Sequence, residues 1–192
     1  MKKILPFFAL LTSSCGNCEE ISLLPEERAW FAPYPDGTQV SFRSNRGRSN
    51  TFTMRKRQEW HTNTDCNRLE SGPYQPIFVQ VVLTPAQPYP GQHQGFVLNM
   101  RKNHPDRPGY LQFDMAGLSC GTPALPGPPD YKLRPQPCTL ADGRTFPAAY
   151  AFREGQNSTG YGNCPLRAFF WDQQAGLIRY ELTNGEVFDL VP

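Results

Sequence analysis

Apolar and polar side chains alternate along much of the chain after Thr38, and this pattern predicts β-strands. Residues 39–43 and 52–54 alternate on either side of turn-forming residues at 45–47, so a first hairpin is expected here. Residues 77–83 form a nearly continuous apolar run, which predicts a central strand covered on both faces.

The second half of the chain continues this pattern. We expect strands over 95–101 and 109–115, and a hairpin over 139–152 around the Asp142-Gly143 turn. The end is clearest, because turn residues separate three apolar-rich segments that predict an antiparallel meander: 168–171, 177–182 and 187–190. Consecutive hairpins without crossover helices predict an all-β fold, an antiparallel meander forming a sandwich or a partly open barrel.

One short N-terminal helix is expected within residues 23–31. Pro25 suits a first helical turn, and Glu26 and Glu27 favour the positive end of the helix dipole. Its apolar residues are expected to plug one end of the sheet.

Composition supports one domain with few helices. The 192 residues are enough for a single core, and 20 prolines and 16 glycines exclude long helices over most of the chain. The net charge is +2, and without Lys2 and Lys3 it falls to zero. This balance gives no reason to expect a nucleic-acid partner.

The N-terminus has the features of an export signal. Lys2 and Lys3 precede an apolar run over 4–11 that is too short to span a bilayer, and small residues lead to Cys15. This pattern resembles the lipobox of bacterial lipoproteins, which implies acylation of Cys15 with palmitate-type chains. The expected organisation is a lipoprotein signal peptide over 1–14, a lipidated cysteine and tether over 15–24, and a single β-rich domain over 25–192. The alternative is an ordinary signal peptide cut near Ser14, which leaves a soluble secreted protein.

A broader resemblance concerns three segments near the C-terminus. Residues 142–150, 169–180 and 184–188 resemble the hairpin, aromatic strand and final turn of many Bacteroidetes lipoproteins, and the acidic pair Glu19-Glu20 is similar to their surface-export signal. The resemblance implies a cell-envelope location at the outer membrane. It carries over no catalytic residues.

Acylation would leave five of the six cysteines. We expect two disulfides, Cys120–Cys138 and Cys66–Cys164, with Cys18 unpaired in the tether, because the first pair would close a proline-rich loop locally. The alternative is a metal site, but the cysteines lack the paired spacing typical of zinc ligands. No metal or cofactor is therefore predicted.

Residues 117–121 match the G-x-S-x-G pattern of hydrolases, with Ser119 as the candidate nucleophile. That motif requires a following helix and a histidine later in the chain. A proline-rich loop follows instead, and His61, His93 and His104 all precede Ser119. A turn is the favoured interpretation.

Two further groups have both a functional and a structural interpretation. A basic hairpin is a candidate contact for anionic lipid headgroups, surface polysaccharide or nucleic acid, although a solvated hairpin that discourages edge pairing is favoured. Its residues are Arg43, Arg46, Arg48, Arg55, Lys56 and Arg57. Aromatic residues on the C-terminal strands either line a ligand cavity or form core; they are Phe169, Phe170, Trp171, Tyr180 and Phe188.

These observations predict a lipid-anchored cell-envelope protein with a non-catalytic binding or structural role. Its expected partners are the membrane, through the lipid, and an envelope protein or polysaccharide. One alternative is a carrier of small hydrophobic ligands in an aromatic-lined β cavity. A hydrolase acting through Ser119 is a third hypothesis.

Overall fold

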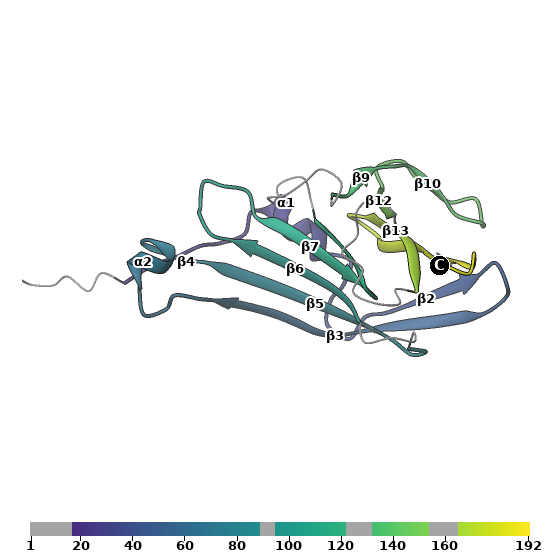
Figure 1. Ribbon diagram of the computed structural model, residues 1–192, viewed down its shortest axis with the longest axis horizontal. Coiled ribbons are helices and arrows are strands. Elements are labelled where there is room, and N and C mark those ends of the chain that lie inside the picture. Colours follow the sequence, from purple (N-terminus) through teal and green to yellow (C-terminus); the bar gives the residue numbers. More distant parts are fainter. Residues whose placement is uncertain (1–16, 89–94, 122–131, 154–164) are drawn as a thin grey trace, which may run out of the picture.

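One curled antiparallel sheet forms the body of the protein (Figure 1). The computed structural model describes residues 17–88, 95–121, 132–153 and 165–192. Within these ranges the sheet has eleven strands, which are, in spatial order, β8 (Leu118–Gly121), β7 (Tyr110–Met115), β6 (Phe96–Lys102), β5 (Ile77–Pro85), β3 (Ser49–His61), β2 (Gln39–Ser44), β15 (Val187–Leu190), β14 (Gly176–Leu182), β13 (Leu166–Asp172), β12 (Tyr150–Arg153) and β9 (Arg134–Pro135).

The sheet curls until its two ends meet. Gly121 on the edge strand β8 forms a bridge with Lys132, and Leu133 N, next to the opposite edge strand β9, donates to Gly121 O at 2.9 Å. The first and last strands of the sheet, β8 and β9, therefore lie close together at this point. The predicted all-β fold is confirmed, and of the two expected arrangements the sheet takes that of a partly open barrel rather than a sandwich.

Aromatic side chains fill the interior of the curled sheet. Phe52 packs edge-on against Phe96 and Tyr180, with ring centroids 4.7 and 5.7 Å apart. Tyr180 stacks on Phe188 at 4.7 Å. These pairs join the N-terminal and C-terminal halves of the sheet through one hydrophobic core.

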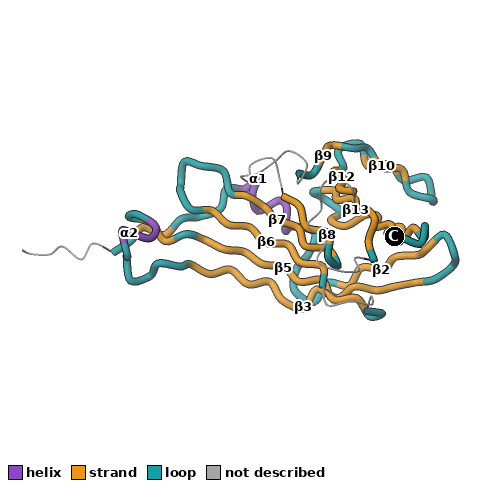
Figure 2. Tube along the Cα trace, in the orientation of Figure 1, coloured by secondary structure: helices purple, strands orange, loops and turns teal. Residues whose placement is uncertain are grey.

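The predicted short N-terminal helix is confirmed, and the helical segment, which we call the helical plug, packs against the core of the curled sheet. It consists of α1 (Pro25–Arg28) and the 3₁₀ turn η1 (Ala29–Phe31). Phe31 is buried in the core, and Trp30 packs against Phe113 and Tyr150. A second four-residue helix, α2 (Arg68–Ser71), lies at the far end of the molecule and was not predicted (Figure 2).

A buried ion pair fixes this helical plug. Lys102 Nζ lies 3.0 Å from Glu27 Oε2, and the two side chains are only 1% and 8% exposed. The Glu27 carboxylate also accepts from Gly109 N at 2.6 Å and Leu24 N at 2.7 Å. Burial alone would raise the pKa of Glu27, but the three donated hydrogen bonds outweigh it and lower that pKa below its ordinary value.

The segment before the helix belongs to the folded domain. β1 (Glu19–Glu20) pairs in parallel with β4 (Tyr74–Gln75), and Ile21 and Leu23 are buried in the core. Residues 18–24, expected to form a tether, are thus fixed against the sheet, and the folded unit begins before residue 25. The predicted signal peptide and Cys15 lie outside the described residues.

The predicted disulfide pairing is wrong. Cys18 is bonded to Cys66, because the β1–β4 pairing brings the N-terminal segment beside the chain that leads into β4. Cys120 and Cys138 are free thiols: Cys120 faces the barrel interior and Cys138 belongs to a second cluster on the outer face, so the sheet separates them. Burial raises the pKa of both thiols. Cys164 lies outside the described residues.

β5 is central but covered on one face only. Its burial alternates strictly from Ile77 to Pro85, so Phe78, Gln80, Val82 and Thr84 on the outer face are only half-buried. The expectation that both faces would be covered is wrong, because no layer lies over this part of the outer face in the described ranges.

Candidate functional site: a charged groove on the outer face

A small hairpin covers part of the outer face of the C-terminal strands. It is formed by β10 (Cys138–Thr139) and β11 (Thr145–Phe146). The apolar residues between the hairpin and the sheet form the second cluster, built from Cys138, Leu140, Ala149, Ala151, Ala168, Phe170 and Ile178. The hairpin therefore makes a local second layer.

A groove of about 540 Å³ opens beside this hairpin, over β2, β15 and β14. Its apolar wall includes Val187, Leu190 and Val191. The charged residues that line the groove are Arg43, Asp142, Arg179, Glu181 and Asp189, and Ala141 of the hairpin lies beside them.

The floor of the groove is a row of charges across three strands. Pairing places Arg43 of β2 opposite Asp189 of β15, and Asp189 opposite Arg179 of β14. Arg179 holds Asp189 with two hydrogen bonds, of 2.6 Å from Nε and 2.9 Å from Nη2. The hydrogen bonds to Asp189 raise the pKa of the Arg179 guanidinium above its ordinary value, which favours its charged form.

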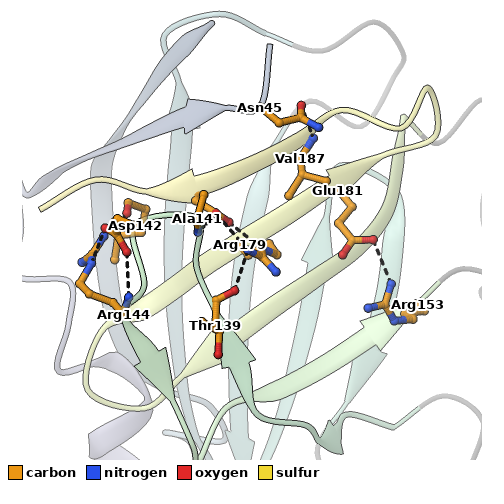
Figure 3. A network of polar contacts seen from close by, with 11 residues as sticks. Asn45, Thr139, Ala141, Asp142, Arg144, Arg153, Arg179, Glu181 and Val187 are labelled. Carbon is orange, nitrogen blue, oxygen red and sulfur yellow. Dashed lines mark hydrogen bonds and ion pairs between the residues drawn. The ribbon is translucent and has the colours of Figure 1, made fainter. Parts of the chain in front are cut away.

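The same ion pair fastens the hairpin to the sheet (Figure 3). Thr139 O accepts from Arg179 Nη2 at 2.9 Å, and Ala141 N donates to Asp189 Oδ2 at 2.7 Å. Arg144 pairs with Asp142 at the hairpin turn and also donates to the carbonyl oxygen of Leu190. The wall of the groove is thus positioned by charged hydrogen bonds rather than by apolar packing alone.

Glu181 forms a second charged centre, on the side of the groove toward β12 and β13. Its Oε2 accepts from Arg153 at 2.9 Å and from Arg167 at 3.1 Å. Arg153 also lies over the Phe170 ring, with the guanidinium carbon 5.1 Å from the centroid. All three carboxylates that line the groove, those of Asp142, Glu181 and Asp189, are therefore paired with arginines.

Arg43 differs from the other charges of the groove. It is exposed, and Asp189, its cross-strand neighbour, already uses both carboxylate oxygens on Arg179 and Ala141. No carboxylate of the described residues makes an ion pair with Arg43. The groove can therefore offer one uncompensated guanidinium beside an apolar wall, which suits a small molecule with an anionic group.

Four residues of the predicted basic hairpin have described side chains, and these lie in different surroundings. Arg43 faces the groove, whereas Arg46 donates to Asn184 O at 2.7 Å and Arg48 pairs with the fully buried Glu186 at the β14–β15 turn. Arg55 is exposed at a β-bulge. Lys56 and Arg57 follow Arg55 in β3, and the structure does not describe their side chains.

Ser119 lies in strand β8, opposite Asp114 of β7. His61 Nε2 is 2.9 Å from Ile21 O, and His104 Nδ1 accepts from Asp106 N. Neither histidine contacts Ser119, and His93 lies outside the described residues. Where the chain is described, no three His, Cys, Asp or Glu side chains come together as metal ligands.

The aromatic group of the C-terminal strands is divided by the sheet. Phe170 points outward into the second cluster, while the other four face the barrel interior; these are Phe169, Trp171, Tyr180 and Phe188. The inward rings contact other aromatic rings of the core, and all five side chains are buried. The hydrophobic-carrier alternative stays a prediction.

Comparison with known proteins gives no relative. No protein-family model matches the chain, and neither the curated proteins nor the solved structures contain a match. No helix among the described residues is both long and apolar enough to cross a membrane. The site must therefore be interpreted from its own geometry.

Sequence reasoning missed Arg179, Glu181 and Asp189. The available signal was the presence of charges at outward positions within apolar strands, since a charge in such a strand requires a partner. Which partner each charge finds depends on strand order, and the local pattern does not contain that order.

Proposed function

We propose that this protein is exported and lipid-anchored at the cell envelope, where its β-domain has a non-catalytic binding role. The observation that carries the proposal is the Cys18–Cys66 disulfide. Disulfides persist in oxidising compartments outside the cytosol, and this one lies three residues after the lipobox cysteine. An anchor at Cys15 would then hold the barrel directly beside the membrane.

The groove beside the β10–β11 hairpin is the candidate ligand site. Its volume suits a small molecule, and Arg43 offers a charge that no carboxylate of the described residues neutralises. Ser119 and the histidines of the described chain stand apart, which supports binding rather than hydrolysis. An envelope protein or polysaccharide is the proposed source of the ligand.

Metabolic labelling with a palmitate analogue tests the anchor. Expressed in a bacterium with lipoprotein-processing enzymes, the full chain should incorporate label, and Cys15→Ala should not. Cys18→Ala is the matched control, because it removes the other cysteine of the same Cys-Gly-Asn-Cys motif and should keep the label. Equal labelling of Cys15→Ala, or a mature N-terminus other than residue 15 by mass spectrometry, contradicts the proposal.

Mass spectrometry of ligands that copurify with the full chain tests the binding role. Arg43→Gln should lose an anionic ligand that the wild type retains. Arg55→Gln removes an exposed arginine outside the groove and should retain it. If the two variants retain the same ligands in the same amounts, the groove is not the binding site.

A further inference from the structure

A second polar surface lies on the other half of the sheet, on the outer face of β3, β5, β6 and β7. Strand register aligns its residues in rows across the four strands. The first row consists of Trp60, Phe78, Arg101 and Tyr110. The second row consists of Gln58, Gln80, Asn99 and Gln112. We call these two rows the aromatic–amide strip.

The first row is a stack of planar groups. Trp60 and Phe78 stack with ring centroids 5.5 Å apart and planes within 12° of parallel. The Arg101 guanidinium, on the neighbouring strand β6, also lies over the Phe78 ring, with its central carbon 5.0 Å from the ring centroid. Trp60 is 40% exposed, and β2 pairs with β3 only as far as Thr53, so no described strand pairs with β3 on the other side of Trp60. An exposed tryptophan indicates a binding surface, because burying so large an apolar ring in the core would stabilise the fold.

The second row carries four amides and no charge. Gln80 Nε2 donates to Asn99 Oδ1 at 2.9 Å. This bond uses one N–H of Gln80 and the carbonyl oxygen of Asn99, so the Gln80 carbonyl oxygen, the second Gln80 N–H and both N–H groups of the Asn99 amide stay available to a ligand. Amides present a donor and an acceptor side by side, which matches the vicinal hydroxyl groups of a sugar.

Charge distinguishes this strip from an ordinary solvated sheet face. Neither row contains a carboxylate, and Arg101 is the one cation in the two rows. Its Nε donates to Asn103 Oδ1 at 2.6 Å, and no carboxylate of the described residues pairs with it. An anionic group on the ligand would complement this fixed guanidinium.

We propose that the aromatic–amide strip binds an acidic polysaccharide. A sugar ring stacks on the exposed face of Trp60, hydroxyl groups bond to the amide row, and a uronate carboxylate pairs with Arg101. Four adjacent strands, spaced about 4.8 Å apart, give a strip about 14 Å wide, enough for a short oligosaccharide. A single-stranded nucleic acid fits less well, because it needs a basic groove that follows its phosphates, and the two rows hold one cation.

This proposal goes beyond the groove and does not depend on acylation of Cys15. The probes are trimers of galacturonic, mannuronic and guluronic acid, with neutral trimers of galactose and mannose as controls. Binding to the full chain is followed by tryptophan fluorescence and calorimetry. At least one acidic trimer should bind, and the corresponding neutral trimers should bind about tenfold or more weakly, since they lack the charged hydrogen bond to Arg101.

Variants locate the binding surface. Arg101→Gln should weaken the acidic trimer about tenfold or more and remove the preference over the neutral trimers. Arg55→Gln is the charge-matched control outside both rows and should bind normally. Arg43→Gln is measured separately, to find whether a trimer occupies the groove. Trp60→Ala should lose binding and Trp60→Phe should keep most of it, and unchanged thermal unfolding of the variants shows that folding is not the cause.

Three outcomes overturn the proposal. The first is that no acidic trimer binds. The second is that Arg43→Gln weakens binding as much as Arg101→Gln, which assigns the ligand to the groove. The third is that an oligo-deoxythymidine probe binds more tightly than every trimer and depends on Trp60, which assigns the strip to nucleic acid.

Discussion

The buried pair between Lys102 and Glu27 should dominate the stability of the helical plug, and Lys102→Met tests it. The substitution keeps most of the side-chain volume but leaves the Glu27 carboxylate buried without its cation. Removing one partner of such a pair costs about 3–5 kcal/mol of unfolding free energy. Two backbone donors remain, from Gly109 and Leu24, so we expect a loss of about 3 kcal/mol, at the lower end of that range.

Urea denaturation at pH 7 measures this loss, with the double variant Glu27→Gln/Lys102→Met as its control. The glutamine removes the uncompensated charge and can still accept one backbone hydrogen bond. The double variant should therefore be more stable than Lys102→Met alone. A positive coupling of this kind assigns the loss to the buried charge rather than to altered packing.

The pH dependence follows from the direction of the pKa shift. Because the pKa of Glu27 is lowered by folding, its contribution is fully present above the pKa of an unfolded glutamate, about 4.3, and is lost as the pH falls through the folded-state pKa. The stability difference between wild type and Glu27→Gln should be largest near pH 7 and shrink below about pH 4. A loss under about 1 kcal/mol for Lys102→Met, or a double variant no more stable than that single variant, would refute the reasoning.

A pair of glycine substitutions tests the packing, and reduction tests the cross-link. Gly176→Ala should lower the unfolding free energy by about 2 kcal/mol or more, because Gly176 has a φ of +77° and an added Cβ would clash with the Tyr34 hydroxyl oxygen. Gly185→Ala is the control: Gly185 has a φ of +80° but open space around it, so this substitution should cost about 1 kcal/mol. Equal losses for the two variants in thermal unfolding would contradict the predicted clash. Reducing the Cys18–Cys66 disulfide, which spans a sequence separation of 48 residues, should lower the unfolding free energy by about 4 kcal/mol in guanidinium titrations. An unchanged midpoint under reductant would show that the unfolded chain is not constrained by this link.

Local sequence was sufficient for most strands and turns. The turns at Gly47, Gly143 and Gly185 all place glycine at positive φ, as the turn-forming residues predicted. The C-terminal meander and the helical plug also follow the hydrophobic pattern. These features depend on neighbours a few residues apart, so alternation and backbone preferences specify them.

The predicted disulfides failed for a non-local reason. Proximity in sequence favoured Cys120 with Cys138, but alternation and layering place these two on opposite faces of the sheet. Cys18 meets Cys66 because β1 adds in parallel to β4, a pairing across more than fifty residues. Neither contact can be deduced from spacing.

The sequence by itself determined the all-β class, the positions of the turns and the short N-terminal helix, because these depend on side-chain periodicity and local backbone preference. Only the tertiary structure decided that β2 pairs with β15, which brings Arg43 within the same groove as Arg179. It also aligned Trp60, Phe78 and Arg101 in one row. Strand order and register are set by burial of the whole core, so the surfaces available for binding arise from contacts that no local segment encodes.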